Sequence, residues 1–170
     1  MKKMNNKGFS LVELIIVIAI MAVLIVVLAP QYLKYVEKSR NSTDVTNATE
    51  IVTAIQVYAS DPDVATADVL GVGTDSIVVG GSGTNIGVTN IKNLDKALEQ
   101  AGFDVDTTAH TMATSCVSKT AWTTYTIEVT VESDGNVTFD YSAGTATNAT
   151  QNFKDAMAGK KIGSGTPANP

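Results

Sequence analysis

The strongest feature of the chain is an uninterrupted apolar run near its beginning. From Phe9 to Ala29 there are twenty-one residues, among which only Glu13 is charged and only Ser10 is otherwise polar. As an α-helix this run would extend about 32 Å, which is long enough to cross the hydrocarbon core of a bilayer. The pattern therefore predicts a hydrophobic transmembrane helix over residues 9–30.

After Pro30 the apolar residues recur at steps of three and four, which predicts an amphipathic continuation of the helix over residues 31–60. Pro30 lacks an N–H and crowds the preceding turn, so we expect the helix either to kink or loosen near residues 26–30 or to break there. The "DPD" that begins at Asp61 should end the helix. The predicted inward stripe contains Val45, Ala48, Val52, Ile55 and Ala59 beside Ile51 and Tyr58, with Glu37, Lys38, Asp44, Glu50 and Gln56 on other faces.

The remaining residues, 61–170, have the pattern of a small globular head. Glycines interrupt short apolar runs over residues 61–90, which predicts a loop region with room for one hairpin. "NLDKALEQAGF" predicts a short helix at about 91–101, with Asn90 or Asn93 as its cap and Gly102 as its stop. Strict alternation on both sides of "SDGN" predicts a β-hairpin at about 122–141. The end of the chain, "GSGTPANP", is predicted to be a flexible tail.

Together these elements predict an α+β fold. The long N-terminal hydrophobic helix is its spine, and the C-terminal head holds an antiparallel β-sheet packed on the second half of that helix. The formal charge of the chain is -5, and an acidic body makes nucleic-acid binding by the subunit alone unfavourable. Cys116 is the only cysteine, so an internal disulfide is impossible.

Candidate chemistry is sparse. His110 is the only histidine, which excludes a histidine-rich metal site, and we interpret His110 and Cys116 as structural residues. The acidic turns at residues 61–68 and 104–106 lack the spacing of a calcium loop, and "GGSGT" is not followed by the Lys and Ser or Thr of a phosphate-binding loop. We therefore predict no catalytic residues, no metal and no cofactor, and no enzymatic activity.

The basic leader "MKKMNNK" precedes the apolar run, which predicts that the start of the chain stays in the cytoplasm while the rest faces outward. The run could be a cleaved secretory signal, a plain anchor, or an anchor that later becomes a packing element. An ordinary signal ends in a small-x-small cleavage site, whereas this run ends in "VVLAPQY". The small residue is instead Gly8, which stands before the apolar run.

The stretch "KGFSLVEL" from Lys7 to Leu14, followed by the apolar run, resembles the class III signal of type IV pilins and pseudopilins. The resemblance implies a leader peptide of residues 1–8, removed by a prepilin peptidase between Gly8 and Phe9, and N-methylation of Phe9. Removing three leader lysines would take the formal charge from -5 to -8. Pro30 stands where many members of the family have a helix-bending proline, and the resemblance implies that it takes part in filament assembly together with Phe9 and Glu13. A chain with one cysteine is more similar to the cysteine-poor pilins of Gram-positive bacteria than to those with a disulfide loop.

The acid at position 13 has two interpretations. An acid in the first turn of a helix is favoured by the unpaired N–H groups and the helix dipole, whatever else it does. Alternatively, Glu13 of one subunit pairs with the new α-amine of Phe9 on an adjacent subunit. A buried ion pair of this kind adds little net stability but can select one register among many for an apolar helix.

The resemblance implies a structural subunit, the major pilin, of a type IV pilus used for adhesion, surface motility or DNA uptake. The implied partners are further copies of the chain in a helical homopolymer, the prepilin peptidase, and an assembly machinery with a cytoplasmic ATPase and a membrane platform protein. The precursor would lie in the cytoplasmic membrane and the assembled pilus outside the cell. Two alternatives remain open: a pseudopilin of a type II secretion or competence apparatus, and a membrane-anchored extracellular binding domain that does not polymerise.

Overall fold

The structure is a computed structural model that describes residues 10–144 and 146–159. The chain divides into two units, Met1–Lys38 and Ser39–Pro170. Helix α1 (Leu11–Ser60) begins in the first unit and ends in the second, directly before Asp61. In the first unit the large apolar side chains from Leu11 to Leu28 are 48% to 74% exposed, so none of the described residues buries a side of this segment.

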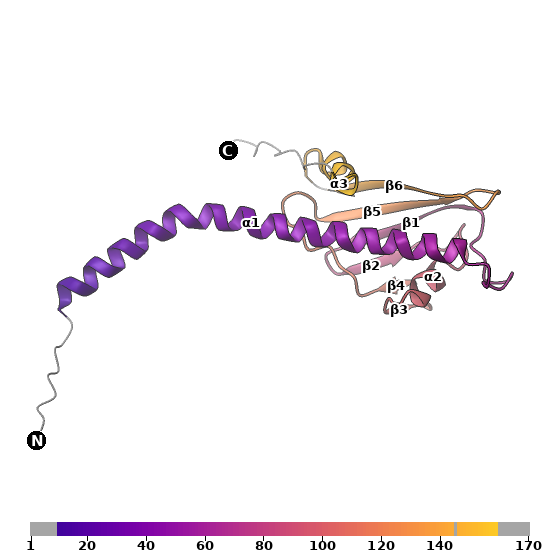
Figure 1. The fold of residues 1–170 in the computed structure, drawn as a ribbon, viewed down its shortest axis with the longest axis horizontal. Coiled ribbons are helices and arrows are strands. Elements are labelled where there is room, and N and C mark those ends of the chain that lie inside the picture. The colour runs from indigo at the N-terminus through magenta and orange to yellow at the C-terminus, as the bar shows by residue number, and fades with distance from the viewer. Residues whose placement is uncertain (1–9, 145, 160–170) are drawn as a thin grey trace, which may run out of the picture. The chain divides into compact units, whose positions relative to one another are not determined.

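The second unit contains one antiparallel sheet (Figure 1). Its strand order is β3-β4-β2-β1-β5-β6. The strands, joined by antiparallel pairings throughout, are β1 (Gly73–Gly80), β2 (Gly83–Ile86), β3 (Val105–Asp106), β4 (Thr111–Met112), β5 (Thr124–Val131) and β6 (Val137–Gly144).

Two short helices flank the sheet. Helix α2 (Leu94–Gln100) contacts β3, and helix α3 (Ala149–Met157) contacts β6, so they stand at opposite ends of the strand order. Figure 1 draws them on opposite sides of the second half of α1. The core joins α1 to the sheet through fully buried aliphatic side chains: Ala48, Ile51 and Ile55 from the helix, and Ile77, Val79, Ile127 and Val129 from the strands.

The predicted α+β class, with a long apolar helix and an antiparallel sheet, is confirmed, but the sheet is larger than the predicted hairpin. Strand β1 lies in the region expected to be mainly loop, and it pairs with both β2 and β5, so that Ile77 is opposite Ile86 on one side and Ile127 on the other. Asp75 and Ser76 interrupt the apolar pattern of β1, which is why its own sequence resembles a loop.

Four further expectations need correction. Helix α3 was not predicted, although Phe153 is buried against Trp122 and Tyr125 with ring-centroid distances of 5.0 and 4.7 Å. Ala59 is exposed, whereas the predicted inward stripe included it. Asn93 is the N-cap residue of α2, as one of the two predicted alternatives had it, but its side chain makes no capping hydrogen bond to the helix. Asp44, placed by its charge on an outward face, is fully buried.

The flexible tail predicted at "GSGTPANP" lies outside the described residues.

Candidate functional site

Within the apolar helix predicted over residues 9–30, the structure describes the chain from Ser10 onward, which includes the first turn of α1. Ser10 precedes the helix, and its backbone N–H donates a 2.9 Å hydrogen bond to Oε2 of Glu13. The carbonyl of Ser10 accepts the first helical bond, from the N–H of Leu14 at 3.3 Å. A Glu that reaches back three residues in this way is one half of a capping box. The carboxylate of Glu13 thus satisfies one of the unpaired N–H groups at the start of the helix.

This capping contact was not foreseen, although the spacing Ser10-x-x-Glu13 is a readable signal for it. It supports the within-helix interpretation of Glu13, because the carboxylate has a hydrogen-bond partner in its own chain. It does not test the pairing with Phe9 of another subunit. Gly8 and Phe9, and with them the predicted cleavage site, lie outside the described residues.

Beyond Glu13 the helix exposes its apolar side chains in every direction. Within the described residues, α1 is the one helix long and apolar enough to cross a membrane, and none of its most apolar 18-residue window is buried. Such a surface is compatible with lipid or with other apolar helices as surroundings. An exposed apolar surface of this size on a water-soluble monomer would be a strong aggregation liability.

Pro30 lies inside α1, so the helix does not end at the proline and the simple break is wrong. Because proline has no N–H, the helical hydrogen bond to the carbonyl of Val26 is missing at this turn. Pro30 and Glu13 are seventeen residues apart on one helix, or about 26 Å along its axis. Of the three residues predicted for filament assembly, Phe9 lies outside the described residues, and the structure places Glu13 and Pro30 at separate points of the apolar helix and not in one site.

A buried polar cluster around Asp44 is the feature that sequence analysis missed. The carboxylate accepts hydrogen bonds from four groups of one loop. The donors are the backbone N–H of Val117 at 2.8 Å and of Ser118 at 2.9 Å, Nε1 of Trp122 at 2.8 Å, and Sγ of Cys116 at 3.3 Å. No sequence motif announces this contact, because the donors follow Asp44 by more than seventy residues.

The same cluster determines the chemistry of the single cysteine. Burial, followed by the nearby charge of Asp44, raises the pKa of the Cys116 thiol from 9.0 to about 12. A protonated, buried thiol is a poor nucleophile. His110 belongs to a different contact, since its Nδ1 lies 2.9 Å from Oδ2 of Asp95. Among the described residues no group of three His, Cys, Asp or Glu side chains is placed to hold a metal ion.

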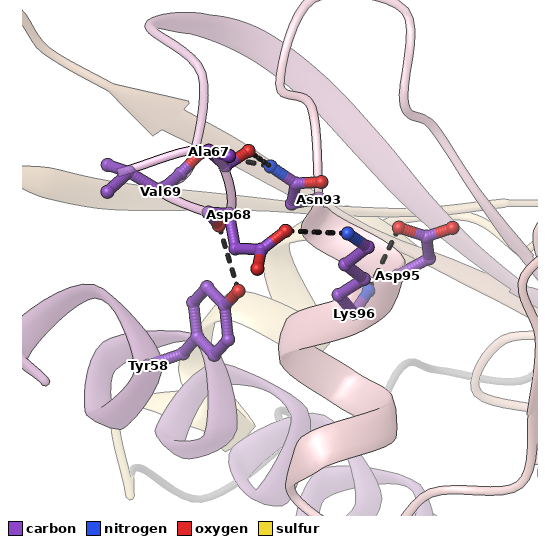
Figure 2. Close-up of polar contacts among 7 residues, drawn as sticks. All are labelled: Tyr58, Ala67, Asp68, Val69, Asn93, Asp95 and Lys96. Carbon is purple, nitrogen blue, oxygen red and sulfur yellow. Dashed lines mark hydrogen bonds and ion pairs between the residues drawn. The ribbon is translucent and has the colours of Figure 1, made fainter. Parts of the chain in front are cut away.

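A second polar cluster ties the loop after α1 to α2 (Figure 2). The hydroxyl of Tyr58 donates to the carbonyl of Asp68 at 2.8 Å, and Nζ of Lys96 lies 2.7 Å from Oδ1 of the same residue. Asn93 contributes by donating its side-chain amide to the carbonyls of Ala67 and Val69. The two helices are therefore held side by side at the end of α1.

Comparison with known proteins gives two matches. The prokaryotic N-terminal methylation motif matches residues 3–29. The type IV major fimbrial protein FimA of Dichelobacter nodosus is 28% identical over 146 residues, which cover 85% of this chain and 78% of FimA. No solved structure matches the chain.

The N-terminal methylation motif, the exposed apolar helix and the α+β head define a pilin-like class of protein. Within that class, the likeness to a major fimbrial protein extends well past the motif into the head, and the chain is similar to type IV pilins both in its processing motif and over most of its length.

Proposed function

We propose that this chain is the major structural subunit of a type IV pilus and that its work is mechanical, with no reaction catalysed. The observation that carries the proposal is the first half of α1, an apolar helix left uncovered by its own chain and headed by a single acid. A helix of this kind needs either lipid or other helices around it, and a precursor in the membrane followed by a bundle in a filament supplies both in turn.

Glu13 is the residue that gives the bundle its register. Leaving lipid for a bundle of apolar helices gains little hydrophobic free energy, so tight packing and specific polar contacts must select one arrangement. After cleavage, the amine of Phe9 would provide a positive partner for Glu13 of an adjacent copy. Any slip along the helix would leave both charges unpaired in apolar surroundings, which is strongly unfavourable.

The cell would handle the subunit in a fixed order. A prepilin peptidase removes residues 1–8 and methylates Phe9, and an assembly machinery with a cytoplasmic ATPase and a membrane platform protein then transfers the subunit from the cytoplasmic membrane into an extracellular pilus. The likeness to FimA over most of the chain supports a filament subunit more than a pseudopilin, because it includes the head as well as the processing motif. Adhesion, surface motility and DNA uptake are the uses that such a filament would serve.

The experiment compares Glu13→Gln with Glu13→Ala in the native host. Glutamine retains an oxygen that can accept from the Ser10 N–H but carries no charge, so it preserves the cap and removes the ion pair. We expect both variants to be cleaved and inserted, and both to lose most sheared surface filaments. Normal filaments from the glutamine variant would show that capping is the whole role of the acid. Mass spectrometry of wild-type filaments should find N-methylated Phe9 as the first residue, and a chain that still begins at Met1 would overturn the proposal.

A further inference from the structure

An open groove of about 650 Å³ lies between the second half of α1 and α2. Its floor is apolar and includes Ala54, Ala97 and Phe103. Val57 stands on its α1 side and is 64% exposed, which is unusual for a valine beside a well-packed core. The groove belongs entirely to the second unit, and Tyr58 on its lining donates to the carbonyl of Asp68, whose carboxylate pairs with Lys96 of α2 (Figure 2).

The polar lining of this groove offers acceptors and few donors. Thr46, Thr49 and Thr53 each donate the hydroxyl proton to a carbonyl one turn earlier in α1, at 2.8 to 2.9 Å, and Tyr58 donates to Asp68. These threonines therefore present methyl groups and lone pairs to the groove. Both charged residues on the lining are acids, Glu50 and Asp61, and the described lining contains no Lys or Arg.

A segment that fits this surface must combine an apolar side chain with cationic donors. The sequence after α3 has that combination, because Lys160 and Lys161 are followed directly by Ile162. Two other lysines of the head already have acidic partners: Lys96 pairs with Asp68 and Lys154 with Asp140. Residues 160–170 lie outside the described part of the chain.

We propose that residues 160–162 of one copy dock in the groove between α1 and α2 of an adjacent copy, with Ile162 on the apolar floor and the two lysines beside Glu50 and Asp61. This inference rests on the proposed function, since it names the contact between heads of neighbouring subunits.

The position of the two partners on the sheet favours a contact between copies. The segment leaves from α3, which contacts β6, whereas the groove adjoins α2, which contacts β3. These strands are the two ends of a six-stranded sheet, which places them about 24 Å apart at about 4.8 Å per strand. A contact that joins opposite edges is heterologous, and repetition of it generates an open series of subunits instead of a closed pair.

The test uses full-length chains that carry one new cysteine each. Val57→Cys and Ile162→Cys copies are produced together, their sheared filaments are mildly oxidised, and disulfide-linked dimers are measured. Thr138→Cys, at an exposed position on β6, replaces Val57→Cys as the matched control. Cys116 is buried and its thiol has a raised pKa, so it should not compete. We expect at least fivefold more mixed dimer with Val57→Cys than with Thr138→Cys.

Charge reversal provides the second arm. Lys160→Glu with Lys161→Glu should lower the yield of mixed dimer at least fivefold, and adding Glu50→Lys should restore it, which a purely structural role of the lysines would not produce. Equal yields of mixed dimer at the groove and control sites would overturn the inference. Filaments that form without the disulfide linkage in the groove would contradict this inference but would not contradict the proposed function as a filament subunit. If the unsubstituted chain forms no sheared filaments, the proposed function fails, and this inference fails with it.

Discussion

Nε1 of Trp122 donates a 2.8 Å hydrogen bond to Oδ2 of Asp44, and this contact joins helix α1 to a loop seventy-eight residues away in the chain. Trp122 in turn packs edge-on against Phe153 of α3, with a centroid distance of 5.0 Å and an interplanar angle of 86°. One carboxylate therefore links α1, the loop before β5 and, through the indole ring, α3. The head depends on this polar contact as well as on its apolar core.

Replacing Asp44 by alanine should destabilise the head strongly. Two backbone N–H groups and the indole N–H would lose a charged acceptor inside the protein, and each such loss costs about 1.5–3 kcal/mol. We expect a loss of about 3 kcal/mol or more in the free energy of unfolding, and a smaller loss for Asp44→Asn. Trp122 is the only tryptophan, so its fluorescence during urea unfolding in detergent measures the change directly. Glu99→Ala, an exposed acid on α2, is the control and should change stability by no more than about 0.5 kcal/mol.

Cys116 should be inert toward thiol reagents while the head is folded. Its side chain is buried, and the neighbouring Asp44 carboxylate together with burial holds the pKa of the thiol near 12. Alkylation at pH 8 should therefore be at least a hundredfold slower than in urea, since the thiolate is the reacting species. The measurement is mass-spectrometric labelling over time. Rapid labelling of the native chain would mean that the loop carrying Cys116 opens readily.

Stability should fall as the pH rises above 9. An unfolded thiol loses its proton near 9.0, whereas the folded thiol keeps it up to about 12, so between these values the unfolded state binds fewer protons. Stability then decreases with increasing pH through that window. Burial also raises the pKa of Tyr125, which adds to the loss above pH 10. Urea unfolding at pH 8, 9, 10 and 11 should show a shallower decline for Cys116→Ala, and identical slopes would exclude the thiol as a cause.

The parts of this molecule that could be predicted from sequence are those with a local physical signature. The apolar run, the spacing of glycine, aromatic and acid at its start, and the alternation in β5 and β6 can each be recognised from the local sequence alone. Asp44 could not be predicted, because its burial depends on donors from the loop at residues 116–122. Strand β1 could be predicted only in part: the hairpin that it forms with β2 fits the one allowed for in residues 61–90, but its pairing with β5 could not be predicted from its own polar-interrupted pattern.

Pro30 provides the last prediction, because α1 continues through it despite the missing hydrogen bond to Val26. Proline in a helix interior costs about 3 kcal/mol relative to alanine, so Pro30→Ala should stiffen the helix at this turn. A helix that must move from bilayer to bundle can use a weak turn as a joint, and the variant should therefore be cleaved and inserted normally but yield fewer filaments. Gln31→Ala, one residue further along the helix, is the control and should assemble like the wild type. Counting sheared filaments by electron microscopy decides the matter. An undiminished filament yield from Pro30→Ala would mean that assembly does not use this turn. The proposed pairing of Glu13 with Phe9 of an adjacent copy would not be affected by that result.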